Sequence, residues 1–338
     1  MRILIGLSGG LDSTYAAYLL KKQGHEVVGA AAIMHEYTDI SAAETAAKQV
    51  GIPFVTVDYR EQFRKNVIER FINDYKNGRT PNPCIVCNPT VKFDALLTYA
   101  KENGFDKIAT GHYAVIGNEN GRYFIKADTA GGKDQSYALS RLTQEQLETL
   151  YLPLSGMKKD DIRKEAAKLG FSAADAKDSQ DICFIPDGDY VSFIEKATGE
   201  SFPTGDFIDP DGKIIGKHNG IIRYTVGQRK GLGAFGRPMF VSKVDPSANT
   251  VTLVPAGEEF SGKTEVGELN FMKLAPMTEG TITASCRVRY SAKPSPCTVT
   301  FDGENAFVEF DNMTRAVTPG QSAVFYDGDD LLFSGIIK

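Results

Sequence analysis

The stretch that decides the fold is residues 1–20, MRILIGLSGGLDSTYAAYLL. It opens with the apolar run Ile3, Leu4 and Ile5, which is typical of a buried strand. The chain then passes through SGGLDS, positions 8–13, into an apolar pattern with helical spacing. Two adjacent glycines leave no Cβ in the way of a phosphate, and free N–H groups at a helix start can donate to it. The stretch therefore predicts a strand, an anion-binding turn and a helix.

The glycine-rich turn is not a Walker loop, because no Gly-Lys-Ser/Thr follows at the right distance. An ordinary turn between a strand and a helix is the alternative. The sequence SGGLDS resembles the pyrophosphatase loop of ATP-dependent adenylating enzymes, which cleave ATP between its α- and β-phosphates. That resemblance implies that Asp12 helps to hold Mg²⁺ on the pyrophosphate.

Length and composition limit the class of protein. A chain of 338 residues is expected to form two or three domains. No apolar run approaches the ~18 residues of a membrane span, and Met1-Arg2 leads directly into a strand pattern, so we expect a cytoplasmic protein with no membrane partner. The net charge of −5 gives no overall attraction to nucleic acid, so RNA binding would depend on local basic patches.

The first two hundred residues alternate strand and helix patterns. Apolar runs at 27–33, 54–57 and 107–109 predict strands of a doubly wound parallel sheet in an α/β fold. A capping box of Ser41 and Glu44 predicts the start of one helix. Three prolines within residues 80–89, TPNPCIVCNP, predict a rigid loop that carries two thiols.

From about residue 203 long helical patterns disappear and short strands separated by turns predict two small, mostly β domains. We expect a catalytic domain at 1–202, a central β-rich domain at 203–265 and a C-terminal β domain at 266–338. Arginines and lysines gather near 223–230 and 287–293, which suits phosphate contact, although a solvated strand face is the common alternative.

Five cysteines in a chain without a secretory signal do not predict a disulfide framework. Cys84-x-x-Cys87 and Cys183 lie in polar or proline-rich sequence and leave several readings open. These are a thioredoxin-type pair, a zinc site that adds His112, an iron–sulfur cluster on the three thiols, persulfide chemistry at Cys87 and Cys183, or buried inert thiols. Inert core thiols are favoured for Cys286 and Cys297, which lie in alternating β sequence.

Taken together, the motifs resemble the tRNA-specific 2-thiouridylases over nearly the whole chain. The matching motifs are SGGLDS (8–13), TPNP (80–83), CN (87–88), KF (92–93), ATGHY (109–113), KDQSY (133–137), KDSQ (177–180), ICFI (182–185), YTVGQRKGLG (224–233), RY (289–290) and RAVTPGQ (315–321). The resemblance implies that the last domain is a β-barrel that contacts tRNA.

The family activity implied is thiolation of the wobble uridine of tRNA. ATP would activate the C2 oxygen as an adenylate, and sulfur would then displace AMP. By resemblance, Cys183 receives a persulfide from a sulfur carrier protein. Cys87 occupies the nucleophile position and forms a disulfide with Cys183, which a reductant must reset.

The resemblance also implies site residues. The ATP contacts would be Gly6, Leu7, Ser8, Gly9, Gly10, Leu11, Asp12, Ser13, Met34 and Gly111; the target base would meet Asn82, Pro83 and Cys84; and the tRNA would meet His112, Lys133, Asp134, Gln135, Arg289, Tyr290 and Gln321. Cys84 stands where most family members have Asp, which keeps a [4Fe-4S] cluster as an alternative. Segment 34–43 is shorter than in the family.

Two further functions compete with thiolation. An adenylating amidotransferase or ligase could use the same nucleotide loop without any cysteine. A noncatalytic RNA-binding or metal-sensing protein could be built on the same nucleotide fold.

Overall fold

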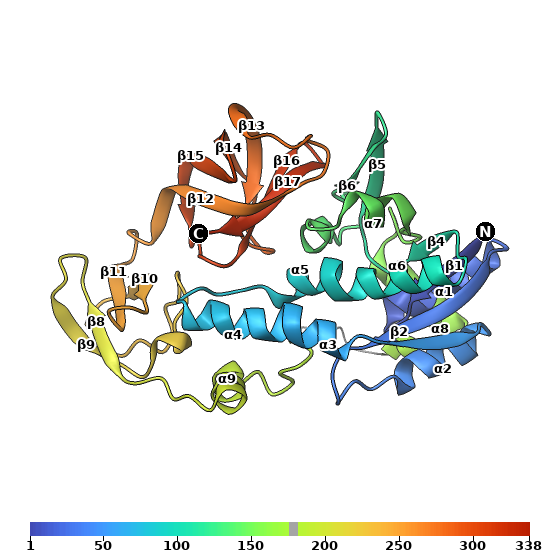
Figure 1. The fold of residues 1–338 in the computed structure, drawn as a ribbon, viewed down its shortest axis with the longest axis horizontal. Helices are drawn as coiled ribbons and strands as arrows, with labels where there is room; N and C mark the ends of the chain where they lie inside the picture. Colours follow the sequence, from blue (N-terminus) through green and yellow to red (C-terminus); the bar gives the residue numbers. More distant parts are fainter. Residues whose placement is uncertain (176–181) are drawn as a thin grey trace.

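A parallel sheet forms the centre of the N-terminal half of the chain (Figure 1). The computed structural model describes residues 1–175 and 182–338, so the predicted motif at 177–180 lies outside the described residues. The sheet has the order β3-β2-β1-β4-β7. Its strands are β1 (Arg2–Gly6), β2 (Glu26–Ile33), β3 (Phe54–Asp58), β4 (Lys107–Ala109) and β7 (Leu150–Tyr151).

Helices cover both faces of this sheet, because the buried strands are apolar on both sides. Leu4 packs in one core with α6 (Phe93–Glu102), whereas Ile3 and Ile5 pack in another with α1 (Leu11–Lys22), α2 (Ser41–Val50) and α8 (Lys159–Lys168). The predicted doubly wound α/β domain is confirmed.

The proline-rich segment corrects one prediction. Residues expected to form a rigid loop instead form helix α5 (Pro83–Cys87), which continues through the π-helix η2 (Asn88–Lys92) into α6. Pro83 occupies the first turn of α5, where its missing N–H costs no hydrogen bond. Pro89 lies in the first turn of η2, where wider π geometry accommodates it. Only residues 79–82 stay extended.

A second correction concerns α2. Ser41 is the first helical residue, and Ile40 occupies the cap position without a side-chain hydrogen bond, so the expected capping box is absent from this described helix. The Ser41 N–H is instead bound by Asp39 Oδ1 at 2.8 Å. Asp39 thus takes the Ser41 N–H that the Glu44 side chain would accept in a capping box, because an aspartate side chain readily bonds the backbone N–H two residues further on.

A helical rod runs away from the sheet edge toward the β domains (Figure 1). It consists of α3 (Arg60–Phe63), the π-helix η1 (Arg64–Ile68) and α4 (Glu69–Lys76). The remaining helical segments are η3 (Ser136–Leu139), α7 (Gln144–Thr149), η4 (Ser172–Asp175), α9 (Tyr190–Thr198) and η5 (Ile221–Arg223). Among the described residues, no helix is long and apolar enough to cross a membrane.

The central domain is a small sheet of order β10-β11-β8-β9. Its strands are β8 (Gly205–Ile208), β9 (Ile214–His218), β10 (Met239–Asp245) and β11 (Thr250–Pro255). Their core residues pack together with Phe71 and Tyr75 of α4 and Ile194 of α9. The rod therefore carries this domain at its far end.

The C-terminal domain is a closed antiparallel barrel, as expected. Its order is β12-β15-β14-β13-β16-β17, and β12 also pairs with β17 to close the sheet. The strands are β12 (Phe260–Phe271), β13 (Glu279–Arg287), β14 (Ser295–Asp302), β15 (Asn305–Arg315), β16 (Ser322–Asp327) and β17 (Asp330–Ile337). Cys286 and Cys297 are buried in its core, which confirms the burial expected for these two thiols.

The barrel and the N-terminal domain share a core. Val324, Tyr326 and Leu331 of the barrel pack with Tyr137 and Phe124. Phe124 belongs to the hairpin β5 (Val115–Glu119) and β6 (Arg122–Lys126), whose turn at Asn120 and Gly121 has positive φ at both positions, as an Asn-Gly hairpin requires.

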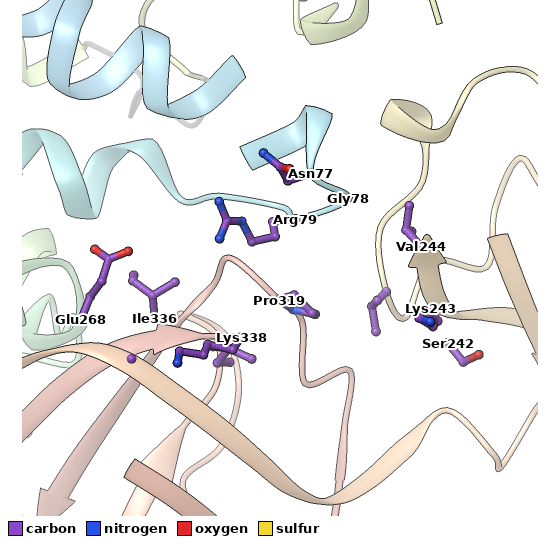
Figure 2. A pocket seen from close by; sticks show the side chains of 13 residues that line it. Asn77, Gly78, Arg79, Ser242, Lys243, Val244, Glu268, Pro319, Ile336 and Lys338 are labelled. Atoms are coloured by element: carbon purple, nitrogen blue, oxygen red, sulfur yellow. The ribbon is translucent and has the colours of Figure 1, made fainter. Parts of the chain in front are cut away.

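All three domains meet around a cavity of about 480 Å³ (Figure 2). Arg79 comes from the segment after α4, Lys243 from β10 of the central domain and Pro319 from the loop that precedes β16. The extended residues 79–82 run through this junction on their way to α5 (Figure 1).

Candidate functional site

A cavity of about 380 Å³ lies at the carboxyl edge of the parallel sheet, where ligands of open α/β sheets bind. Its described lining is Gly6, Leu7, Ser8, Asp12, Ser13, Ala30, Ala31, Ala32, Met34, Thr38, Asp39, Ile40, Ala43, Val57, Lys92, Phe93, Ala95, Leu96, Thr110, Gly111, His112 and Gln135. Seven of the ten residues expected at ATP are in this lining. Of the other three, Leu11 is a buried core residue packed with Ile3 and Ile5.

The turn at 8–13 is arranged to receive an anion. The Ser13 hydroxyl lies 3.2 Å from the Ser8 backbone nitrogen and 3.1 Å from the Ser8 hydroxyl. Gly10 immediately precedes α1 and offers no side chain to cap it. The first N–H groups of α1 therefore remain able to donate to phosphate oxygens.

Two glycines of the site are required by packing as well. Gly9 has φ +77°, and a Cβ there would lie 2.5 Å from the Ala42 Cβ at the start of α2. A Cβ on Gly111 would lie 2.7 Å from the Ser13 nitrogen. The sequence predicts that the glycines leave space for a phosphate. In the structure, Gly9 and Gly111 also allow α1 to approach α2 and the segment that follows β4.

Asp12 is surrounded by donors. Its carboxylate accepts a hydrogen bond from the Tyr113 hydroxyl at 2.6 Å and pairs with Lys133 at 3.1 Å and Lys159 at 3.5 Å. Among residues 1–175 and 182–338, no three His, Cys, Asp or Glu side chains are grouped so that they could hold a metal ion. The groups nearest the Asp12 carboxylate are thus two ammonium groups and a hydroxyl, not further Mg²⁺ ligands. The Lys133 and Lys159 ammonium groups lie where they could neutralise the charge of nucleotide phosphates.

Cys84, Cys87 and Cys183 lie close enough to interact electrostatically with Lys92, which belongs to the cavity lining. Cys84 and Cys87 lie one turn apart on α5; Cys84 is exposed, and Cys87 is only 4% exposed. Next to the exposed Cys183, the Phe184 ring packs edge-on against Phe63 with 5.5 Å between ring centroids, in the core that contains Cys87. Burial raises the pKa of the Cys87 thiol to about 12, and the neighbouring Cys183 and Cys84 add to the rise.

Lys92 is a candidate functional residue that the sequence indicates only as part of the KF motif at 92–93. It lines the nucleotide-sized cavity and also interacts with all three thiols. Burial alone would lower its pKa, but Cys87, Cys84 and Cys183 raise it above the ordinary value. In return, the Lys92 charge favours the thiolate forms of Cys87 and Cys183. Lys92 lies five residues after Cys87 in one continuous helical run, and this short spacing is the feature of the sequence that could have indicated their proximity.

Replacing Lys92 with methionine is expected to slow alkylation of Cys183 severalfold at about pH 8, because loss of the ammonium raises the thiol pKa and the thiolate is the nucleophile. Iodoacetamide labelling followed by peptide mass spectrometry measures the rate. Lys101→Met, on the exposed end of α6 and paired with Glu145, is the matched control and should label as the parent does. Equal labelling of the Lys92 variant and the parent would contradict the assignment.

His112 lies in the cavity wall beside Thr110, whose hydroxyl is 2.9 Å from the imidazole Nδ1. Burial lowers its pKa to about 4, and the Lys92 and Lys133 charges act in the same direction against the opposing effect of Asp12. The imidazole is therefore neutral at pH 7 and can accept or donate a hydrogen bond without carrying charge.

The depressed pKa of His112 predicts acid lability. In the unfolded chain a histidine titrates near ~6.5, so the unfolded state binds more protons between about pH 6.5 and about pH 4. The free energy of unfolding should fall by about 1–2 kcal/mol between about pH 7 and about pH 5 from this group. Urea denaturation of His112→Gln should show a flatter pH dependence, and His25→Gln, outside the cavity, should not. An unchanged slope in His112→Gln would count against this origin.

The segment 133–135 joins the cavity to the barrel. Lys133 pairs with Asp12, and the Gln135 side chain accepts the Tyr113 N–H at 3.0 Å. Asp134 pairs with Arg287 of the barrel at 2.8 Å, and its carbonyl accepts from the Tyr290 hydroxyl at 3.4 Å. The structure thus brings together four residues expected at tRNA, Lys133 to Gln135 and Tyr290.

Arg289 and Gln321, also expected at tRNA, lie within the three-domain junction. Arg289 donates to the Val226 carbonyl at 2.8 Å and to the Thr318 hydroxyl, and burial lowers its pKa. The Gln321 amide donates to the Thr80 carbonyl at 2.7 Å. Both side chains therefore hold domains together. Asn82 and Pro83, expected at the target base, lie at the start of α5 near this junction.

Comparison with known proteins agrees with this architecture. The family profile described as "tRNA methyl transferase HUP domain" matches residues 1–187, "tRNA methyl transferase PRC-barrel domain" matches 191–255 and "Aminomethyltransferase beta-barrel domain" matches 261–337. Three similar proteins carry the name tRNA-specific 2-thiouridylase MnmA. They are from Clostridium acetobutylicum (44% identical, 100% of this chain and 99% of the relative), Clostridioides difficile (43%, 100% and 98%) and Acetivibrio thermocellus (42%, 100% and 99%).

Proposed function

The chain belongs to the family of tRNA-specific 2-thiouridylases, and from this premise we propose that it is an ATP-dependent sulfurtransferase that converts the wobble uridine of tRNA to 2-thiouridine. The single observation that carries the detailed mechanism is the position of Lys92, which lines the nucleotide-sized cavity and interacts with all three clustered thiols. Nucleotide and sulfur chemistry then share one site.

In the first step ATP occupies the cavity with its phosphates over the turn at 8–13. The uridine C2 oxygen attacks the α-phosphorus, and pyrophosphate leaves. Lys133 and Lys159, now paired with Asp12, supply positive charge beside the phosphates. Asp12 and Asp39, the two carboxylates of the described cavity lining, would hold Mg²⁺ together with the nucleotide phosphates, since Mg²⁺ is usually bound by one or two carboxylates and phosphate oxygens.

In the second step the terminal sulfur of a Cys183 persulfide attacks C2, and AMP leaves with the electron pair of the C2–O bond. The Cys87 thiolate then attacks Cys183 Sγ, which forms a Cys87–Cys183 disulfide and leaves the sulfur on C2 as 2-thiouridine. A dithiol reductant resets the disulfide, and a persulfide carrier protein reloads Cys183. Because the pKa of Cys87 is about 12, this thiol needs a change in its surroundings before it reacts.

The proposal includes the remaining expectations. The catalytic domain spans 1–202, the central domain 203–265 and the tRNA-contacting barrel 266–338, and the protein works in the cytoplasm. The cavity and thiol residues act on ATP and sulfur, while the surface formed by Lys133, Asp134, Gln135 and Tyr290 meets the tRNA. His112 lies between the two regions.

The direct test is a mass measurement. Incubating the protein with ATP, Mg²⁺, a persulfide donor and unmodified tRNA should replace one oxygen by sulfur in a single uridine, detected by nuclease digestion and mass spectrometry. Pyrophosphate release that depends on tRNA separates an enzyme from a noncatalytic RNA-binding protein. Folded protein that yields neither product would refute the proposal.

The iron–sulfur alternative remains testable because Cys84 lies with the other two thiols. Iron and sulfide analysis of anaerobically purified protein separates the two mechanisms. A stoichiometric cluster required for turnover would replace the persulfide route, whereas full activity of metal-free protein would exclude the cluster.

A further inference from the structure

The junction of the three domains is centred on one residue, Thr80. Its N–H donates to the Pro319 carbonyl at 2.8 Å, and its carbonyl accepts from Gln321 Nε2 at 2.7 Å. Its hydroxyl donates to the Thr225 hydroxyl of the central domain at 2.9 Å. The barrel thus holds both backbone groups of Thr80, and the central domain holds its side chain.

The chain on the α4 side of Thr80 is fixed too. Arg79 donates its backbone N–H to the Asp74 carbonyl and pairs with the buried Asp74 carboxylate, both at 2.8 Å. Figure 2 shows Arg79 directly above the loop that carries Pro319. A Cβ on Gly320, which has φ +91°, would lie 2.9 Å from the Thr80 nitrogen, so the two backbones are in close contact. The segment after α4, the barrel and the central domain are therefore held together at this junction by specific contacts.

Thr80 lies three residues before Pro83, the first residue of α5, and residues 81–82 between them are extended. Pro81 and Pro83 restrict the backbone there, because proline fixes its own φ and limits the residue before it. Because residues 81–82 have little backbone freedom, a displacement of Thr80 should move the start of α5 by a similar amount. Helix α5 carries Cys84 and Cys87.

We propose that Thr80 is a positioning residue: through its bonds to the barrel and the central domain, it sets the place of helix α5, and hence of Cys87, relative to bound tRNA. The inference rests on the proposed function, since it deepens the role of that site. It implies that Arg289 and Gln321, which lie at this junction, act on the position of Cys87 through Thr80. RNA that engages those side chains would change the position of Thr80.

The test uses the full-length protein and single-turnover sulfur transfer from preloaded persulfide. Thr80→Val keeps the side-chain shape but removes the hydroxyl bond to Thr225, and Thr225→Val removes the same bond from the other side. Each variant should lower the rate constant three- to tenfold, the usual effect of one neutral hydrogen bond, at an unchanged Kd for tRNA. The double variant should be no slower than the slower single variant, and Thr80→Ser should retain the parent rate.

The matched control is Thr281→Val, which breaks a hydroxyl–hydroxyl contact of 3.2 Å between exposed Thr281 and Thr300 on the barrel surface. It should react at the parent rate. A parent-like rate in Thr80→Val, or a loss accounted for entirely by weaker tRNA binding, would overturn the proposal.

A second readout does not depend on thiolation. Without tRNA, Cys87 should be alkylated by iodoacetamide at least about threefold faster in Thr80→Val than in the parent, because release of one neutral hydrogen bond makes local opening of α5 easier by that factor. If the parent proves inactive toward tRNA, the proposed function fails, and the alkylation rates alone decide the positioning role. Identical rates would then reject it.

Discussion

Replacing Cys183 with serine is expected to abolish sulfur transfer to tRNA, by at least about a thousandfold, while tRNA-dependent pyrophosphate release continues. Serine cannot carry a persulfide, so the second step loses its sulfur source, but the nucleotide cavity has no contribution from Cys183 among its described lining residues. Rapid-quench assays that follow pyrophosphate and thiolated nucleoside in the same samples measure both steps.

Cys87→Ser tests the partner thiol in the same assay. This variant should stop after Cys183 becomes attached to the tRNA through a disulfide, which nonreducing electrophoresis detects as a covalent complex. Cys286→Ser, in the barrel core away from the site, is the matched control for the loss of a thiol and should retain activity. Full turnover in both the Cys87 and Cys183 variants would instead favour an adenylating ligase or amidotransferase that needs no cysteine.

Gly9→Ala is expected to reduce the free energy of unfolding by about 2–5 kcal/mol and also to weaken ATP binding. The left-handed backbone costs a residue with a Cβ about 1–2 kcal/mol, and crowding a packed contact costs about 1–3 kcal/mol. Here the new methyl would lie 2.5 Å from the Ala42 Cβ and 2.7 Å from its carbonyl oxygen. Urea denaturation and calorimetric ATP titration give the two quantities.

The neighbouring Gly10 supplies the matched comparison. Its φ is −76°, and a Cβ there would meet only the Ser8 hydroxyl, at 3.4 Å, among the described atoms. Gly10→Ala should therefore leave stability nearly unchanged and weaken ATP binding alone, because the methyl would stand where the phosphates approach α1. Parent-like stability of Gly9→Ala would show that α2 can move aside, and the packing role of Gly9 would be wrong.

The predicted rigid loop at the proline-rich segment was wrong, because the prolines occupy positions that a helix tolerates. Sequence rules treat three prolines in ten residues as incompatible with a helix, but proline is tolerated in the first turn. Because Pro83 begins α5 and Pro89 lies in the first turn of η2, the helix carries Cys87 and Lys92 on one continuous run. A loop would not have fixed the lysine against the thiols.

The sequence by itself determined the doubly wound domain, the strand–turn–helix unit at 1–20 and the all-β second half, whereas it left the chemistry of Cys84, Cys87 and Cys183 open. These follow from hydrophobic periodicity, turn chemistry and motif order, which are local properties of the chain.

Only the tertiary structure decided which charged and titratable groups interact with one another. It placed Lys133 and Lys159 on Asp12, inserted Lys92 among three thiols and raised the pKa of Cys87 to about 12 by burial. It also bonded Thr80 to two other domains. Burial and through-space electrostatics depend on contacts between residues far apart in the chain, so no local pattern can specify them.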